Sequence, residues 1–258
     1  MEYKEYSKDK DALMVFLHGG GVSGWMWDKQ VSHFASKYHI LVPDLPGHGN
    51  SSGENFSIQD SAERVIQLIQ DKGKEKPVIV IGFSLGAQIL LHMLSIKKDL
   101  IDFAIINSAL TIPIKFGAKL LLPILKVTYP LVKLRSFAKL QSKVLYIDNN
   151  QFELYFKESS QTDLNTFMQV MNENMSFQIP ERYSESMANI LITVGEQEKP
   201  MMKESAEKLV QLHHQAEGII IPKIGHGISL ANPNYFNDLV EGWITNSSLP
   251  EDIKKIQK

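Results

Sequence analysis

Short runs of apolar, largely β-branched residues recur along the chain and are separated by glycines, prolines and polar residues. Six runs stand out, at residues 13–17, 39–42, 78–81, 103–106, 190–194 and 219–221. Runs that are apolar throughout are typical of strands in a parallel sheet, because helices cover both faces of such a sheet. The pattern therefore predicts six buried strands.

Between these runs, apolar residues recur at spacings of three and four, as expected for one face of a helix. The clearest examples are Ala62, Val65, Ile66 and Ile69, then Ile89, Leu90, Met93 and Leu94, and then Ala206, Leu209 and Val210. Strands that alternate with helices indicate the α/β class. We expect a mostly parallel central sheet flanked by helices.

The alternation stops between residues 108 and 187, where helical patterns occur without a convincing strand. We interpret this segment as a helical cap inserted into a core formed by residues 1–107 and 188–258. Its apolar residues either seal it onto the core or line a substrate pocket, for which Phe156 and Met171 are candidates. The polar tail, residues 250–258, is expected to be frayed.

Composition narrows the function classes. The 258 residues carry a net charge of −2, so no basic excess favours nucleic acid as a partner, and no charge run or exposed amphipathic stretch suggests a docking role. The absence of cysteine excludes disulfides and thiolate chemistry. The polar N-terminus lacks a secretory signal, which favours a cytoplasmic protein. Lys126 and Lys133 interrupt the most apolar segment, residues 120–134, so no transmembrane segment is expected.

One motif carries chemistry. Gly82-Phe83-Ser84-Leu85-Gly86 fits the pattern G-x-S-x-G, with an apolar run before it and a helical pattern after it. Such a sharp strand-to-helix turn exposes a nucleophilic serine, and the two glycines leave room for the crowded backbone. Ser84 is therefore the candidate nucleophile, at a helix N-terminus whose dipole favours a developing oxyanion.

Together with three further motifs in order, this turn resembles the α/β-hydrolase superfamily over nearly the whole chain apart from the insertion. The four motifs are residues 17–21 (LHGGG), 43–51 (PDLPGHGNS), 82–86 (GFSLG) and 224–227 (IGHG). The resemblance gives His18, His48 and Asp44 a part in shaping loops. It implies a serine hydrolase of the esterase type, whose catalytic triad needs a base and an orienting carboxylate.

His226 is the candidate base, because it lies in a glycine-flanked loop after a late apolar run. The superfamily's acid commonly follows a strand in a G-x-x-D pattern, where this chain has Gly195-Glu196-Gln197-Glu198. Glu198 matches by spacing, and the order Ser84, Glu198, His226 agrees with the superfamily. Glu196 remains an alternative.

An acyl transfer also needs N–H donors for the oxyanion. The resemblance assigns this oxyanion hole to the amides of Leu85 and Gly20, with Gly21 as an alternative to Gly20. Trp25, shortly afterwards, either contacts the acyl group or anchors the following helix.

The resulting hypothesis is hydrolysis of small apolar or lipidic carboxylic esters through an acyl-enzyme. The alternatives are hydrolysis of lactones, thioesters, carbon–carbon bonds or peptides, and a non-catalytic protein that binds a small ligand on the same scaffold. The sequence implies no metal and no cofactor. It does not predict the oligomeric state.

Overall fold

An eight-stranded sheet forms the centre of the computed structural model, which describes residues 1–114, 117–247 and 249–258. The strand order is β1-β3-β2-β4-β5-β6-β7-β8. The strands are β1 (Tyr3–Tyr6), β2 (Leu13–Leu17), β3 (His39–Pro43), β4 (Val78–Phe83), β5 (Phe103–Asn107), β6 (Asn189–Gly195), β7 (Ala216–Ile221) and β8 (Lys254–Ile256). Strands β2 to β7 are parallel, whereas β1 and β8 pair antiparallel at the two edges.

All six strands predicted from the apolar runs are present, and they form the parallel part of the sheet. The sequence pattern missed the edge strands β1 and β8. Both are short, polar and largely exposed, so they lack the apolar signal that marks the others. The expectation that residues 250–258 are frayed is therefore wrong for Lys254–Ile256, which pair with β7.

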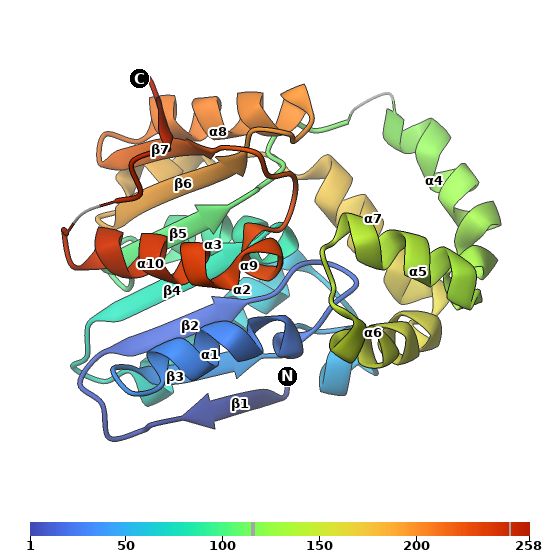
Figure 1. Ribbon diagram of the computed structural model, residues 1–258, viewed down its shortest axis with the longest axis horizontal. Coiled ribbons are helices and arrows are strands. Elements are labelled where there is room, and N and C mark those ends of the chain that lie inside the picture. The colour runs from blue at the N-terminus through green and yellow to red at the C-terminus, as the bar shows by residue number, and fades with distance from the viewer. Residues whose placement is uncertain (115–116, 248) are drawn as a thin grey trace.

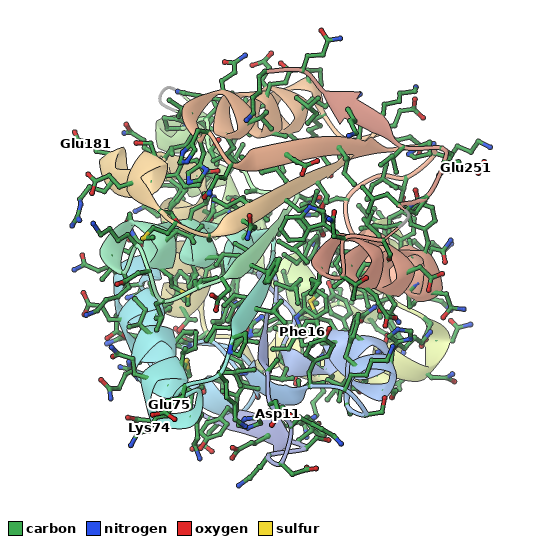
Figure 2. The ribbon with its side chains drawn as sticks, turned by 90° about the vertical axis from the view of Figure 1, so that its left-hand side faces the viewer. Asp11, Phe16, Lys74, Glu75, Glu181 and Glu251 are labelled. Carbon is green, nitrogen blue, oxygen red and sulfur yellow. The ribbon has the colours of Figure 1, made fainter. Side chains whose placement is uncertain are left out.

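Helices cover both faces of the sheet (Figure 1). On one face, α2 (Ile58–Lys72), α3 (Leu85–Ile96) and α8 (Pro200–Leu212) pack on the sheet, and on the other face lie α1 (Asp28–Phe34), α9 (Ile228–Ala231) and α10 (Pro233–Ile244). Figure 2 shows Phe16 inside the molecule, while Lys74, Glu75 and Glu181 lie at its surface. Full burial of a side chain such as Phe16 contributes about 1.5–3 kcal/mol to stability.

Between β5 and β6 the described residues form helices and no strand. These inserted helices are α4 (Gly117–Thr128), η3 (Tyr129–Lys133), α5 (Arg135–Val144), α6 (Asn149–Gln161), α7 (Leu164–Ser176) and η4 (Glu181–Glu185). Figure 1 shows α4 to α7 beyond the ends toward which the parallel strands point. Val170 packs with the core on one face of the sheet and Phe152 with the core on the other, so the insertion bridges the two.

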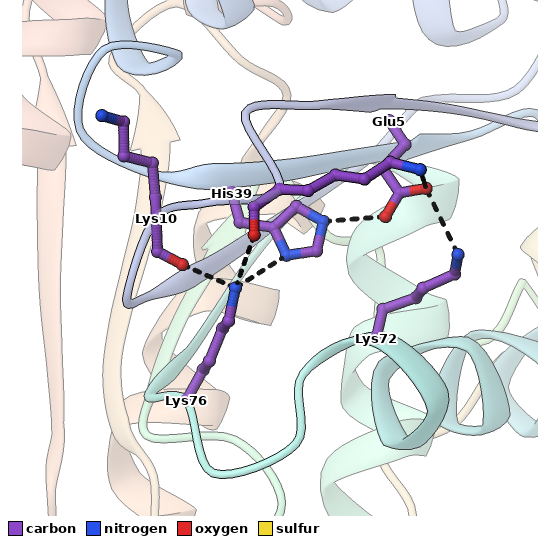
Figure 3. A network of polar contacts seen from close by, with 6 residues as sticks. Glu5, Lys10, His39, Lys72 and Lys76 are labelled. Carbon is purple, nitrogen blue, oxygen red and sulfur yellow. Dashed lines mark hydrogen bonds and ion pairs between the residues drawn. The ribbon is translucent and has the colours of Figure 1, made fainter.

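A polar network ties the N-terminal edge strand to the sheet (Figure 3). The buried His39 ring shares one hydrogen bond with Glu5, at 3.0 Å, and another with Lys76, at 3.3 Å. Lys8 and Lys72 also pair with the Glu5 carboxylate. Burial opposes ionisation of Glu5, but the hydrogen bonds from Lys8, His39 and Lys72 outweigh it and lower the pKa from 4.5 to about 2.

We expect Glu5→Gln to lower the free energy of unfolding by about 1–2 kcal/mol at pH 7 after allowance for solvent screening. Because the folded-state pKa is depressed, this stabilisation is present above about pH 4.5 and is lost as the pH falls toward 2. Urea denaturation at pH 7 and at about pH 3 measures the difference. The exposed Glu2 provides the control substitution, Glu2→Gln, and an equal effect of Glu5→Gln at both pH values would contradict the explanation.

Candidate active site

Ser84 occupies a strained turn between β4 and α3. Its backbone has φ 52° and ψ −110°, in the left-handed half of conformational space that non-glycine residues rarely adopt. The Ser84 amide donates to the Asn107 carbonyl oxygen at the end of β5, at 2.9 Å. The sheet thus fixes the turn that carries the serine, and strain of this kind is common at functional sites.

Backbone crowding explains the two glycines of this turn. A Cβ on Gly82 would lie 2.5 Å from the carbonyl oxygen of Gly86. A Cβ on Gly86 would lie 2.3 Å from the carbonyl oxygen of Leu17. Since neither approach leaves space for a side chain, only glycine allows the helix to follow the serine so closely.

His226 and Glu198 meet across two neighbouring loops. Glu198 follows β6 and His226 follows β7, and the Gln197 amide donates to the Ile224 carbonyl oxygen at 2.8 Å, which holds the loops together. His226 Nδ1 lies 2.8 Å from Glu198 Oε2. The imidazole packs on the ring of Phe83, the residue before Ser84, with centroids 4.8 Å apart.

In the described residues the Ser84 hydroxyl forms no hydrogen bond with His226, although its neighbour Phe83 contacts the imidazole. Hydrogen bonds between nucleophile and base are often loose in the absence of substrate. The structure therefore joins the candidate base to the candidate acid, and the residue before the serine packs on the base.

The Glu198 carboxylate is buried, and both of its oxygens have hydrogen-bond partners. Its Oε1 accepts the Ser108 hydroxyl at 2.6 Å and the Gly195 amide at 2.9 Å. Burial opposes ionisation, but the His226, Ser108 and Gly195 hydrogen bonds outweigh it and lower the Glu198 pKa. The group is therefore an anion at neutral pH, able to orient an imidazole and to stabilise its charged form.

Sequence reasoning missed Ser108. The end of β5 carries Asn107 and Ser108, neither of which has a carboxylate that could serve as the triad acid. The position after β5 nevertheless faces the loop after β6, so the hydroxyl reaches the carboxylate. A small hydroxyl residue directly after this strand is the signal that could have identified it.

Glu196, the alternative acid, points elsewhere. Its carboxylate accepts the Lys223 amide at 3.0 Å and pairs with Lys254 at 2.5 Å on the exposed side of the loop. The hydrogen bond from the Lys254 side chain lowers the pKa of the Glu196 carboxyl group. Glu198 is thus the carboxylate of this loop that contacts His226.

Two backbone amides border the serine. Gly20 lies against the Leu85 side chain, and both residues line the same cavity as Ser84. In the described part of the chain, neither the Gly20 nor the Leu85 amide has a hydrogen-bond acceptor. Gly21, the alternative to Gly20, also lines the cavity, with φ +77°.

The loop-shaping parts expected for His18 and Asp44 fit their contacts. His18 Nε2 accepts the Leu45 amide at 2.9 Å, and Nδ1 lies 2.8 Å from the Gly19 carbonyl oxygen. Burial, together with the neighbouring His48, lowers the His18 pKa to about 3, so the ring is neutral. Asp44 accepts the amides of Gly24 and Asn50, each at 2.9 Å.

A cavity of about 260 Å³ opens beside Ser84, between the end of the sheet and the inserted helices. Its lining includes Val132, Leu145, Val170 and Met171 from the insertion. The core contributes His48 and the loop that carries Gly20 and Gly21. The lining is mostly apolar, as expected of a pocket for an apolar small molecule.

Of the three candidate substrate contacts, Met171 lines this cavity, whereas Trp25 and Phe156 do not. The Trp25 indole is buried and donates to Glu158 of α6 at 2.8 Å. The Phe156 ring stacks on Phe152, with centroids 6.2 Å apart, and faces Arg135. Trp25 anchors an inserted helix, and Phe156 packs inside the insertion, so neither is a contact of this pocket.

No cluster of three or more His, Asp or Glu side chains that could hold a metal ion occurs in residues 1–114, 117–247 and 249–258. None of the helices in this part of the chain is long and apolar enough to cross a membrane.

Known proteins share both the sequence pattern and the fold. The model of the alpha/beta hydrolase family matches residues 14–239. The chain is 24% identical over 244 residues to (E)-2-((N-methylformamido)methylene)succinate hydrolase of Acinetobacter baylyi, covering 90% of this chain and 89% of that protein. It is 32% identical over 89 residues to pimeloyl-[acyl-carrier protein] methyl ester esterase of Vibrio atlanticus, covering 34% and 33% of the two chains.

Among solved structures, MenH from S. aureus superposes with a TM-score of 0.76 at 19% identity, covering 95% of this chain and 98% of that one. This likeness concerns the fold. The family match extends over most of the chain, including the serine turn and the histidine loop. The chain therefore belongs to the alpha/beta hydrolase family.

Proposed function

We propose that the protein hydrolyses carboxylic esters of small apolar or lipidic acids through an acyl-enzyme formed on Ser84. The observation that carries the proposal is the buried Glu198 carboxylate hydrogen-bonded to His226, whose ring packs beside the serine turn. A buried anion on an imidazole near a half-buried, strained serine is the arrangement that activates a hydroxyl as a nucleophile.

In the proposed mechanism, His226 Nε2 accepts the Ser84 proton while Oγ attacks the ester carbonyl carbon. The Glu198 carboxylate accepts a hydrogen bond from Nδ1–H, which fixes the tautomer and stabilises the imidazolium. The Gly20 and Leu85 amides donate to the oxyanion of the tetrahedral intermediate. The intermediate collapses, His226 protonates the departing alcohol, and the acyl group remains on Ser84.

Water completes the reaction. His226 removes a proton from a water molecule, which attacks the acyl carbonyl carbon. The second tetrahedral intermediate collapses and releases the acid, while His226 returns the proton to Ser84 Oγ. Each oxyanion donor of this kind typically contributes about 10²- to 10³-fold to the rate. The Gly20 and Leu85 amides, which have no acceptor within the described residues, are available for this role.

The insertion, residues 108–187, is proposed to act as a cap over the site. Polar contacts hold it on the core: Glu158 accepts the Trp25 indole N–H at 2.8 Å, and Glu173 accepts the Ile58 amide at 3.0 Å. Between these attachments, Met171 and Leu145 form an apolar wall of the cavity beside Ser84. This wall favours an acyl chain over a charged or strongly polar acid.

Turnover of p-nitrophenyl esters graded in acyl length, beside lactones and acyl thioesters, tests the proposed function. We expect the esters to be the preferred substrates, with activity falling once the chain exceeds the cavity. Preference for lactones or thioesters would assign the site to that reaction instead, and no turnover of any of them would contradict the proposal.

Met171 gives a prediction about acyl length. Met171→Ala enlarges the cavity, so we expect the preferred acyl chain to become longer. Met168→Ala is the matched control, because this methionine is on the same helix and comparably half-buried but does not line the cavity. The measurement is kcat/KM across the ester series, and an identical length profile in all three proteins would contradict a wall role for Met171.

A further inference from the structure

Exposed apolar side chains gather on the consecutive elements α4, η3 and α5. The six are Ile124, Val127, Leu131, Leu134, Leu140 and Val144, with exposures from 38% to 79%. They account for six of the ten large hydrophobic side chains exposed in the described part of the chain. Figure 1 shows α4 and α5 on the side of the molecule away from α8 and α10. We call these six side chains the apolar face, and a concentration of this kind marks an interaction surface.

The same segment is strongly basic. Residues 103–147 contain seven Lys and Arg and no Asp or Glu, whereas the whole chain has 27 basic and 29 acidic residues. The rest of the chain is therefore net acidic. Four lysines of the segment are exposed among the apolar side chains and form no ion pair with a described residue: Lys126, Lys133, Lys139 and Lys143.

The inner side of η3 and α5 lines the cavity. Three cavity residues each neighbour a member of the apolar face in sequence, namely Val132 beside Leu131, Gln141 beside Leu140, and Leu145 beside Val144. A single layer of η3 and α5 therefore separates the apolar face from the candidate active site.

We propose that the apolar face docks on the surface of an anionic phospholipid bilayer. Exposed leucines and valines bury apolar surface when they enter the boundary between headgroups and acyl chains, which is favourable. Lysines at that depth contact lipid phosphates. The surplus of positive charge on this face matches an anionic surface. A second copy of the chain would instead bring the same positive charges together, and a nucleic acid would leave the apolar side chains without a partner.

The inference deepens the proposed function and rests on it for the nature of the substrate. A lipidic ester dissolved in the bilayer would reach the cavity through the layer that touches the lipid. Since the net-acidic remainder of the chain is repelled by the same surface, the charge distribution also orients the cavity toward the membrane.

Co-sedimentation with vesicles tests the docking. The full chain is mixed with vesicles of phosphatidylcholine alone or of equal parts phosphatidylcholine and phosphatidylglycerol, at low and high salt. We expect binding to the anionic vesicles that weakens at high salt, because salt screens exposed charges. Binding to the neutral vesicles should be much weaker.

A pair of matched variants locates the surface. Lys139→Glu/Leu140→Ser changes the apolar face, and Lys208→Glu/Leu212→Ser makes the same two changes on exposed positions of α8. We expect the first to reduce the affinity for anionic vesicles about tenfold or more and the second to leave it unchanged. Lys126→Glu/Lys133→Glu, on α4 and η3, is a second variant should the first fail to fold, and it should lose affinity similarly.

Hydrolysis of a water-soluble ester without vesicles separates this inference from the proposed function. Equal hydrolysis by wild type and variants, with binding lost only in the apolar-face variants, supports the docking. Vesicle binding by a protein that hydrolyses no ester would overturn the proposed function and leave the docking supported. Failure of the wild type to bind anionic vesicles, equal binding by all variants, or self-association abolished by the apolar-face changes would overturn the docking.

Discussion

Replacing Ser84 with alanine is expected to lower kcat/KM for a short p-nitrophenyl ester by about 10⁴- to 10⁶-fold. The change removes the attacking oxygen and keeps the Cβ that the strained turn already accommodates. Because the hydroxyl makes no hydrogen bond with a described residue, its loss leaves no buried partner unpaired. The thermal unfolding midpoint should therefore stay close to that of the wild type.

Ser95→Ala serves as the control for this substitution. Ser95 lies near the far end of α3, where its hydroxyl donates to the His92 carbonyl oxygen at 2.7 Å. We expect this variant to retain full activity. The measurement is steady-state ester hydrolysis by the two variants and the wild type. Turnover by Ser84→Ala at a rate close to that of the wild type would show that the serine is not the nucleophile.

Glu198→Gln is expected to lower kcat by about 10³- to 10⁴-fold. The amide is nearly isosteric and can still accept from Ser108 and Gly195, so the loop should keep its shape. Toward His226, however, the amide presents an N–H donor to Nδ1. The imidazole proton is then held on Nε2, where it prevents the ring from accepting the serine proton.

Glu196→Gln, two residues earlier in the same loop, is the matched control. This carboxylate pairs with Lys254 at the surface, so its neutralisation should leave kcat unchanged. A large loss in Glu196→Gln with little effect of Glu198→Gln would reverse the assignment of the acid.

The parallel part of the sheet could be predicted because its strands are buried on both faces and therefore apolar throughout. Residues 78–81 and 190–194 are examples, and both lie inside observed strands. The edge strands could not be predicted in this way. Lys254–Ile256 has one flank paired with β7 and the other open to solvent, so its sequence carries no apolar run.

The candidate site likewise contains residues that the sequence predicts and residues that it does not. Ser84 and His226 could be identified because glycines beside them reflect tight local turns, which leave a signal in a few neighbouring letters. The choice between Glu198 and Glu196 depends on which way a loop turns, and Ser108 joins the site from a distant strand. Spacing along the chain does not encode such contacts.

The insertion differs from its sequence interpretation in one respect. Its leucines and methionines indicate burial, and the sequence suggested no exposed amphipathic stretch. In the structure Leu140 and Val144 are more than 60% exposed, while Ala138 and Ser142 of the same helix are buried. The expectation of no such stretch is therefore wrong, because the smaller residues of α5 pack inward.

Covalent labelling tests the central claim most directly. The intact protein is treated with an alkylphosphonate p-nitrophenyl ester. A serine activated by a neighbouring base attacks the phosphorus and displaces p-nitrophenolate, and the modified residue is located by peptide mass spectrometry. The account predicts a single phosphonylated residue, Ser84, with labelling abolished in Ser84→Ala and strongly slowed in Glu198→Gln. Labelling at another residue, or equal labelling of Ser84 when Glu198 is replaced, would contradict it.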